Sequence, residues 1–496
     1  MKNILLILPE VYLILCALGI LISEITDPGA KKRFYTEIAL FGIAGAAIQV
    51  ILNYEMGNSK YFFEVLNNDA FSLFLKLTTL IFLAFSVVQD KFAANNNESY
   101  QRPLGEAETL FVKLTVTVVL MLLLSSVNLV FSTFSLIGLL TLCYLTLAFQ
   151  KKDEQSIYGA LFGLVGSSFS IVLLLLGLVL LYRGTGSMDY IEIHRQIQTI
   201  DGASRAYVDV SFVCVLFSVF WIWGVFPSHQ LTQSVLSSAA LSSFYFVGSV
   251  FRVASFGFFF RVVMTIYMSP AQQPGQWYPV EMSFSWTKVI AIASAITLLV
   301  SAINTLRPKN LRHYLVSVWM VQSGYLLVGF LAFDEVGISS VLYTLLTDLI
   351  SMGGAVITLS LLEKKYKTVQ LKGLIGAAYK AAPQAILFLL LLCSLIGVPP
   401  FPGFMSKFSL VSSIMRYGKT ELVFACMVCT LISWVSLASV FRAFLVREKN
   451  ISLHEEILTK KQRLYLVLMI LPLLLMSAMS DWILNVAGRS AQFILW

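Results

Sequence analysis

Long apolar segments recur along the whole chain, and they constrain its fold more than any other feature. Most are close to the roughly 20 apolar residues that an α-helix needs to cross a bilayer, and polar connections separate them. Apolar residues make up 58% of the 496 residues and charged residues only 12%, whereas soluble domains average about a quarter charged. The sequence therefore predicts an all-α polytopic membrane protein.

We expect about fourteen transmembrane helices. Their approximate ranges are 4–22, 36–53, 70–89, 108–126, 127–149, 158–182, 209–226, 237–267, 286–304, 313–333, 338–361, 384–415, 420–444 and 464–487. The first range has no small-residue cleavage site, so we interpret it as a membrane span and not as a cleavable signal.

Two of these segments, the seventh and the twelfth, cannot be continuous helices. A proline inside a helix removes a backbone donor and clashes with the preceding turn. The residues that predict the breaks are Pro227 in the seventh segment and Pro399, Pro400, Pro402 and Gly403 in the twelfth. Unwound backbone at membrane depth is tolerated only where protein or a water-filled cavity satisfies it, so both breaks are candidate functional positions.

The positions of the breaks indicate an internal repeat. If segments four to eight and nine to thirteen form two groups, the broken helix is fourth in each. An odd number of helices per group makes the repeats inverted, and matching interrupted helices point to a pathway at the midplane. We expect N-terminal helices over 1–107, repeats over 108–268 and 286–445, and a last helix within 464–496. The alternative is that two helices contain proline by chance.

Basic residues fall mainly in the connections after odd-numbered segments, for example in 31–33, 151–152, 307–312, 364–380 and 447–463. The positive-inside rule places these connections in the cytoplasm and both termini outside. We expect the chain to lie in the cell inner (cytoplasmic) membrane. The net charge of +8 therefore reports topology, and we expect no nucleic-acid partner. The basic stretches 364–380 and 460–463 are expected to contact anionic lipid, with docking of a soluble protein as the alternative.

Several charged side chains fall inside apolar segments, where each costs about 2.5–3.5 kcal/mol on insertion scales and often marks a proton or ion pathway. They are Lys76, Lys113, Arg252, Arg261, Asp348 and Lys407. Lys407, just past the twelfth-segment break, and Asp348 are our candidates for proton exchange, whereas Arg252 is expected to hold a fixed charge. We interpret Lys113 and Arg261 as reaching toward headgroups, which is also the alternative for Lys407.

His229 lies two residues after Pro227, and because imidazole titrates near neutral pH it is a further candidate. The six cysteines all lie in apolar segments. Cys426 and Cys429 form a CxxC without a second pair or a nearby histidine, so we expect neither a disulfide nor a metal site.

Several motifs resemble one family in colinear order: LLPEVYLIL, AFSLFLKL, EQSIY, FPSH, FRVASFGFFFRVV, SVWMVQSGYLLVGFLA and GVPPFPGFMSKFSL. They look like the antiporter-like membrane subunit N of NADH:quinone oxidoreductase, respiratory complex I. The resemblance implies fourteen helices in two inverted five-helix repeats with broken seventh and twelfth helices. It also implies proton translocation coupled to quinone reduction elsewhere, other membrane subunits as partners, and no cofactor or redox chemistry in this chain.

Some charged positions of the family are matched by charged residues of this chain, and others are not. Lys407 matches the family's terminal lysine, Arg252 falls where a central lysine is usual, and Lys76 matches a basic residue common in the third helix. Charged or titratable positions of the family are occupied here by Ile137 or Gly138, Tyr158, Ile222 and Gln322. The first-half Glu/Lys pair is therefore missing, and we expect a modified or impaired first half-channel.

Other functions remain open from the sequence. The chain could be a non-conducting structural subunit of complex I, or a subunit of a multisubunit cation/proton antiporter or membrane-bound hydrogenase. A third reading is a free-standing secondary transporter that binds its substrate at the broken helices.

Overall fold

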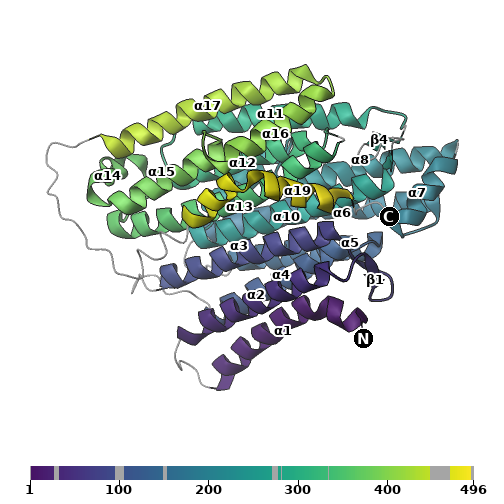
Figure 1. Cartoon of the computed structure of the whole chain (residues 1–496), viewed down its shortest axis with the longest axis horizontal. Helices are drawn as coiled ribbons and strands as arrows, with labels where there is room; N and C mark the ends of the chain where they lie inside the picture. Colours follow the sequence, from purple (N-terminus) through teal and green to yellow (C-terminus); the bar gives the residue numbers. More distant parts are fainter. Residues whose placement is uncertain are drawn as a thin grey trace.

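The computed structural model describes residues 2–26, 33–94, 106–148, 154–200, 202–270, 277–280, 282–332, 334–446 and 470–492. Most helices run along one common direction, which is horizontal in Figure 1. The helices are α1 (Lys2–Thr26), α2 (Arg33–Tyr54), α3 (Ala70–Ala94), α4 (Glu106–Ser125), α5 (Leu129–Ala148), α6 (Glu154–Thr185), α7 (Tyr190–Thr199), α8 (Ala203–Trp223), α9 (His229–Ser238), α10 (Leu241–Ile266), α11 (Trp286–Thr305), α12 (Leu311–Gly329), α13 (Glu335–Tyr366), α14 (Ala377–Lys380), α15 (Ala382–Ile396), α16 (Pro402–Arg416), α17 (Thr420–Leu445) and α19 (Ser480–Gln492).

The remaining regular elements are short. The 3₁₀-helix η1 covers Leu371–Leu374, and two antiparallel hairpins pair β1 (Ser59–Tyr61) with β2 (Leu66–Asn68) and β3 (Met268–Pro270) with β4 (Trp277–Pro279). Helix α7 lies in a connection for which the sequence analysis predicted no helix. It begins where the Asp189 side chain accepts hydrogen bonds from the backbone N–H groups of Ile191 and Glu192, which is a common way to start a helix.

Eleven helices of the described residues are long and apolar enough to cross a membrane, and a bent pair brings the number to twelve. The predicted class, an all-α multi-pass membrane protein, is confirmed. The count of fourteen and the two inverted repeats stay predictions.

The last predicted span, 464–487, contains a sharp bend. Its residues 464–469 lie outside the described part, and the rest forms two helices, Ile470–Ala478 and Ser480–Ser490, bent by 79°. Ser480 and Asp481 follow the bend. Because serine and aspartate favour the start of a helix over its interior, they allow a new helix to begin there.

The two predicted breaks are present. Helix α8 ends at Gly224, in the left-handed conformation at φ 75°, and α9 begins after Pro227. Helix α15 ends at Gly397, also left-handed at φ 87°, and Pro399 and Pro400 lie in the connection to α16. Glycine adopts this conformation without strain, which is why it often ends helices.

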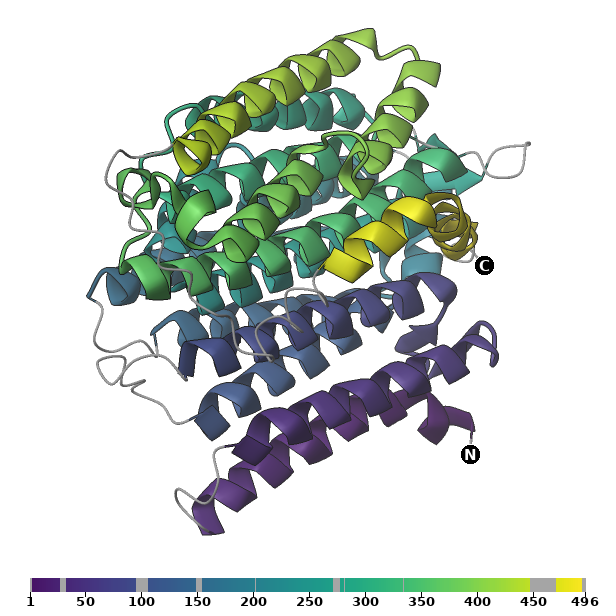
Figure 2. The ribbon, with the colours of Figure 1, turned by 60° about the vertical axis from the view of Figure 1, so that its left-hand side comes forward.

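Helices α10 and α13 form the centre of the bundle, and α1, α6 and α17 lie at its edges. The most apolar window is fully buried in α10 and 89% buried in α13, compared with 28% in α6 and 33% in α1 and α17. Figure 2 shows α1 and α2 along one edge and α17 at the opposite edge. Helices that are mostly apolar around their whole circumference are suited to such a central position, and Arg252, Arg261 and Asp348 are buried with them.

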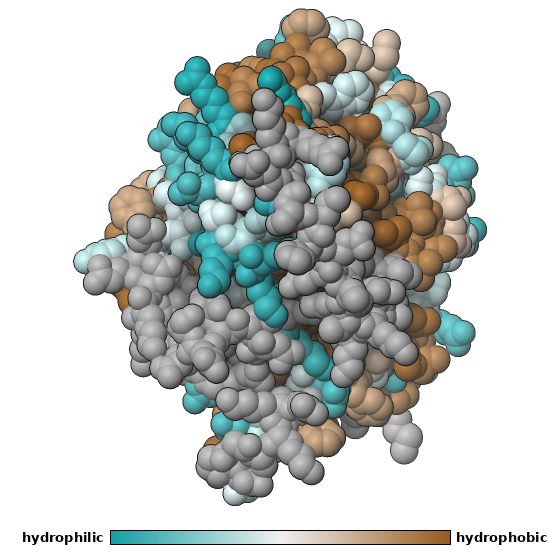
Figure 3. Space-filling view, turned by 90° about the vertical axis from the view of Figure 1, so that its left-hand side faces the viewer, coloured by the Kyte–Doolittle hydropathy of each residue, from teal (hydrophilic) through white to brown (hydrophobic). Residues whose placement is uncertain are grey.

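The two ends of the bundle differ. In Figure 1, α1 begins at the right-hand end, near β1 and α7, while α14 and the C-terminal end of α17 lie at the left-hand end. Figure 3 faces the end that lies at the left in Figure 1, and hydrophilic side chains cover part of it. Near α14, Lys365 donates a hydrogen bond to the Lys380 carbonyl at 2.7 Å. The basic stretches 31–32, 151–152 and 447–463 lie outside the described residues.

Candidate functional site

Lys407 lies directly against the break in the twelfth predicted segment. Its side chain is 7% exposed, and Nζ donates hydrogen bonds to the carbonyl oxygens of Leu395 at 2.8 Å and Ile396 at 2.9 Å. These carbonyls belong to the last turn of α15, where they have no partner within the helix and carry partial negative charge. The break therefore creates the acceptors that hold the ammonium group.

Two glycines allow α15 and α16 to approach closely enough for this contact. A Cβ atom at Gly403 would lie 1.8 Å from the Ser394 carbonyl oxygen, and one at Gly397 would lie 3.0 Å from Cδ of Lys407. Pro402 is the first residue of α16, a position at which its missing N–H has no helical acceptor. The sequence PPFPG thus starts α16 beside the end of α15.

Helix α12 completes the surroundings of Lys407. The ammonium lies over the Tyr325 ring at 4.8 Å from its centroid, a favourable cation–π distance. Gln322, which stands where the resemblance places a histidine, donates a hydrogen bond to the same Leu395 carbonyl that Lys407 uses.

Arg252 of α10 and Asp348 of α13 form a buried ion pair, with 3.6 Å between Nη1 and Oδ2. Both residues are 1% exposed. Nη2 of Arg252 donates to the Trp319 carbonyl and, at 2.9 Å, to the Ser323 hydroxyl, and the guanidinium lies over the Trp319 ring at 3.5 Å. These contacts fix the arginine to α12 from two sides.

Asp348 interacts electrostatically with both Arg252 and Lys407. The structure thus brings together three of the predicted residues, from α10, α13 and α16, which we call the three-charge array. It contains two cations and one anion, so one positive charge is not balanced within it. An ammonium and a carboxylate that share one buried region can exchange a proton through water, whereas an arginine keeps its proton.

Several atoms of the array have hydrogen-bonding capacity left over. Arg252 Nε and Nη1, Asp348 Oδ2 and Gln322 Oε1 are buried without a hydrogen-bond partner among the described residues. An unsatisfied buried polar group costs about 1–3 kcal/mol, and ordered water is the usual partner in such places. The array is therefore chemically suited to hold the water that proton transfer requires.

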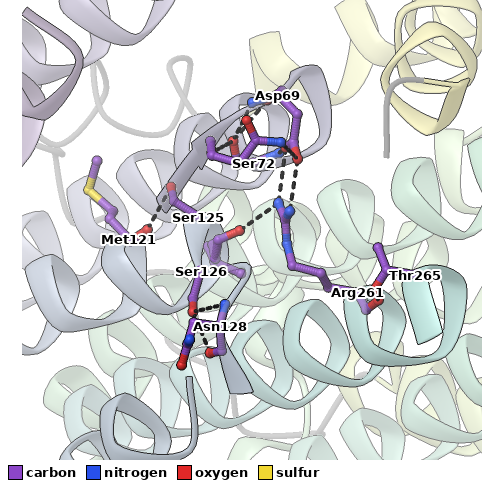
Figure 4. Close-up of polar contacts among 10 residues, drawn as sticks. Asp69, Ser72, Met121, Ser125, Ser126, Asn128, Arg261 and Thr265 are labelled. Atoms are coloured by element: carbon purple, nitrogen blue, oxygen red, sulfur yellow. Dashed lines mark hydrogen bonds and ion pairs between the residues drawn. The ribbon is translucent and has the colours of Figure 1, made fainter. Parts of the chain in front are cut away.

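The interpretation of Lys113 and Arg261 as groups that reach headgroups was wrong. Lys113 is 6% exposed and pairs with Asp90 at 2.6 Å and the Ser86 hydroxyl at 2.7 Å. Arg261, which is 2% exposed, binds both oxygens of Asp69 at 2.8 and 3.0 Å, as Figure 4 shows. Each cation has a carboxylate partner on another element, and this pairing offsets part of the free-energy cost of burying the charge.

Lys76 forms a third buried ion pair in the N-terminal part. Its Nζ lies 2.7 Å from Oε1 of Glu10 on α1 and 3.3 Å from the Tyr61 hydroxyl. The sequence analysis identified Lys76 but missed Glu10. The available signal was the position of Glu10 inside the first apolar segment, since an acid at that depth needs a partner.

The other candidate positions lie apart from the array. His229 is in the first turn of α9, 7% exposed, with its ring stacked on Phe226. The hydrogen bonds and ion pairs of the described residues do not join it to the array. Ile222 is buried and Tyr158 is 70% exposed on α6. The first-half positions at which the resemblance places lysines therefore carry no lysine in this chain.

Relatives of known name align with most of this chain. It is 24% identical over 423 residues to NADH-quinone oxidoreductase subunit N of Methylovorus glucosotrophus (strain SIP3-4), with 84% of this chain and 83% of the relative covered. It is 26% identical over 449 residues to NAD(P)H-quinone oxidoreductase subunit 2 of Synechococcus sp. (strain JA-3-3Ab), with 89% and 80% covered.

Solved structures share the fold. A chain of respiratory complex I from Thermus thermophilus with bound aureothin matches with a TM-score of 0.76 at 18% identity, covering 97% of this chain and 99% of that one. A chain of the Mrp complex from Dietzia sp. DQ12-45-1b matches with a TM-score of 0.78 at 16% identity, covering 98% and 97%. A chain of the archaeal membrane-bound sulfane sulfur reductase matches with a TM-score of 0.84 at 13% identity, covering 99% and 98%.

The family profile described as "NADH:quinone oxidoreductase/Mrp antiporter, TM" matches residues 126–433, which include α5 to α16 and all three residues of the array. Because this match covers more than half of the sequence, the chain belongs to the NADH:quinone oxidoreductase/Mrp antiporter transmembrane family.

Proposed function

We propose that this chain is a proton-translocating, antiporter-like membrane subunit of an NADH:quinone oxidoreductase. In this role it couples quinone reduction elsewhere in the complex to H⁺ transfer across the membrane, and its partners are the other membrane subunits and lipid. The names of the relatives, subunit N and subunit 2, support the choice of complex. The observation that carries the proposal is the buried ammonium of Lys407 at a helix break, within range of an electrostatic interaction with Asp348.

The three-charge array supports a simple mechanism. Lys407 accepts a proton from water, the two α15 carbonyls hold its ammonium by hydrogen bonds, and Asp348 stabilises it electrostatically. Arg252 competes for the same carboxylate, because its Nη1 is 3.6 Å from Oδ2. When Asp348 turns toward Arg252, Lys407 loses its counter-charge and releases the proton; when it turns back, Lys407 is charged again. Arg252 remains a fixed cation throughout.

The experiment that tests the proposed complex is copurification in mild detergent. A tagged copy of the chain should retain other membrane subunits and NADH:quinone reductase activity. Purification with the subunits of a cation/proton antiporter or a membrane-bound hydrogenase would contradict it, as would a functional monomer.

A second candidate is a subunit of such an antiporter or of another membrane-bound respiratory complex. The observation in its favour is structural: the similarity to the Mrp and sulfane sulfur reductase chains is as high as that to complex I. Since these identities are below 20%, they bear on the fold alone. A non-conducting structural role in complex I is the remaining alternative, and replacement of Lys407 tests it.

We also propose that both termini face outward, in the inner membrane, with the two inverted repeats over 108–268 and 286–445. If so, a cysteine at exposed Lys60 (Lys60→Cys) should react with an impermeant maleimide in intact cells, and Lys309→Cys only after permeabilisation. All six native cysteines lie in helices, five of them buried and Cys16 partly so, so background labelling should be low. The reverse labelling pattern would show that the chain has the opposite orientation in the membrane.

A further inference from the structure

Helix α3 carries a row of polar side chains on one face. The α3 row consists of Asp69, at the residue before the helix, and Ser72, Lys76, Thr79, Ser86 and Asp90. Successive members are three, four or seven residues apart, and such spacings place side chains on the same face of a helix. From first to last the row extends about 31 Å at 1.5 Å per residue, which matches the thickness of the hydrocarbon core.

Every member of the α3 row is buried, with exposures of 6% or less. Three of them are charged, and each pairs with an opposite charge on another element: Asp69 with Arg261, Lys76 with Glu10, and Asp90 with Lys113. Buried ion pairs are rarely more stabilising than apolar residues of similar volume. Three of them along one helix in a membrane protein therefore indicate a role beyond stability.

The three pairs are chemically different. Arg261 binds both oxygens of Asp69 and also donates to the Leu124 carbonyl at 2.9 Å. Both carboxylate oxygens are therefore engaged, and the cation is an arginine that keeps its proton. It serves as an anchor at the end where α3 begins. The other two pairs each join a lysine to a carboxylate, and both partners of such a pair can exchange protons.

Unsatisfied polar atoms accompany these two lysine pairs. Both amide atoms of Gln89, which is fully buried beside Asp90, lack a hydrogen-bond partner among the described residues, as do both carboxylate oxygens of Glu10 apart from the ion pair. Buried groups of this kind are normally satisfied by water. Water is therefore expected at both lysine pairs.

The stretch between the lysine pairs is short. Thr79 and Ser86 are separated by about 10 Å along the helix, and Leu83 occupies the same face between them. On the adjacent helix α10, Phe246 contacts both Lys113 and Phe82 of α3. Ser249, one turn farther along α10 toward Arg261, is fully buried and adds a further hydroxyl group to α10. A few water molecules would connect the two halves of the row, and Leu83 would close it between transfers.

We infer that α3 carries a second proton-transfer route, from Lys113 and Asp90 at one end to Lys76, Glu10 and Tyr61 near the other. This inference rests on the proposed function. A proton taken up from water at one lysine pair passes through the intervening water to the second pair and leaves from it, so that each lysine and carboxylate returns to its starting state. The route uses none of the three-charge array and supplies the N-terminal part with titratable groups that Ile222 and Tyr158 do not provide.

The test uses the variants Lys76→Arg and Lys113→Arg in the assembled complex in proteoliposomes. Arginine keeps the positive charge and the ion pair but does not release its proton. We expect normal assembly and normal NADH oxidation with an artificial electron acceptor. With quinone as the acceptor, we expect fewer protons to be translocated per NADH oxidised. The loss should add to that caused by Lys407→Met when the variants are combined. Lys91→Arg, on the same helix but 34% exposed in its side chain, is the matched control and should leave the ratio unchanged.

A purely structural role predicts that both arginine variants pump as the wild type does, and that result overturns the inference. If pumping responds to Lys407→Met and not to the α3 variants, only the α3 route fails. If neither responds, the proposed function fails with it. If an arginine variant does not assemble, a double variant that neutralises both partners of the pair replaces it, because it leaves no unpaired charge. The two double variants are Glu10→Gln with Lys76→Met and Asp90→Asn with Lys113→Met, and the same loss of pumping is expected from each.

Discussion

Replacement of Lys407 by methionine is expected to remove the proton transfer carried by the three-charge array while leaving the protein folded. Methionine has a similar length but no titratable group. The two α15 carbonyls lose their donor, but Asp348 and Arg252 still form a neutral ion pair. Because a buried charge is removed at the same time, we expect a change in stability of within about 1 kcal/mol.

The measurement is the number of protons moved per NADH oxidised by the reconstituted complex, together with the amount of assembled complex. Lys309→Met removes an exposed lysine of a connection and should alter neither. A wild-type ratio in the Lys407→Met variant with normal assembly would leave only a structural role for this region.

Replacement of Asp348 by asparagine should have a larger effect on stability as well as on pumping. Asp348 is the only carboxylate of the three-charge array and interacts electrostatically with both Arg252 and Lys407, so asparagine leaves the array with two buried cations and no anion. Breaking a buried pair by removing one partner costs about 3–5 kcal/mol. We expect a lower melting temperature of the purified complex and loss of the Lys407-dependent share of pumping.

Two further variants separate these effects. Asp481→Asn changes an exposed aspartate at the start of α19 and should alter neither the melting temperature nor pumping. Adding Arg252→Met to Asp348→Asn removes one of the two unbalanced cations, so stability should recover in part while pumping does not. If Asp348→Asn alone melts and pumps like the wild type, Asp348 is not the counter-charge of Lys407.

The sequence by itself determined the features that depend on local chain chemistry. The succession of apolar segments predicted the multi-pass helical class, because the length of such a segment is set by the bilayer. Pro227, Pro399 and Pro400 predicted the two interruptions, because proline disrupts a helix whatever surrounds it. The placement of Lys407 just past the second interruption was also visible in the sequence.

Only the tertiary structure decided which charges meet. Membrane helices are apolar on most sides, so periodicity does not reveal which face of one meets which face of another. Glu10 with Lys76, Asp69 with Arg261 and Asp90 with Lys113 are far apart in sequence, and the interpretation of Arg261 and Lys113 as groups that reach headgroups was wrong for that reason. Hydropathy also did not predict the bend before Ser480, because an average over many residues does not detect the few polar residues at which a new helix begins. Local chemistry fixed where helices form and break, and packing fixed the partners that give each buried charge its role.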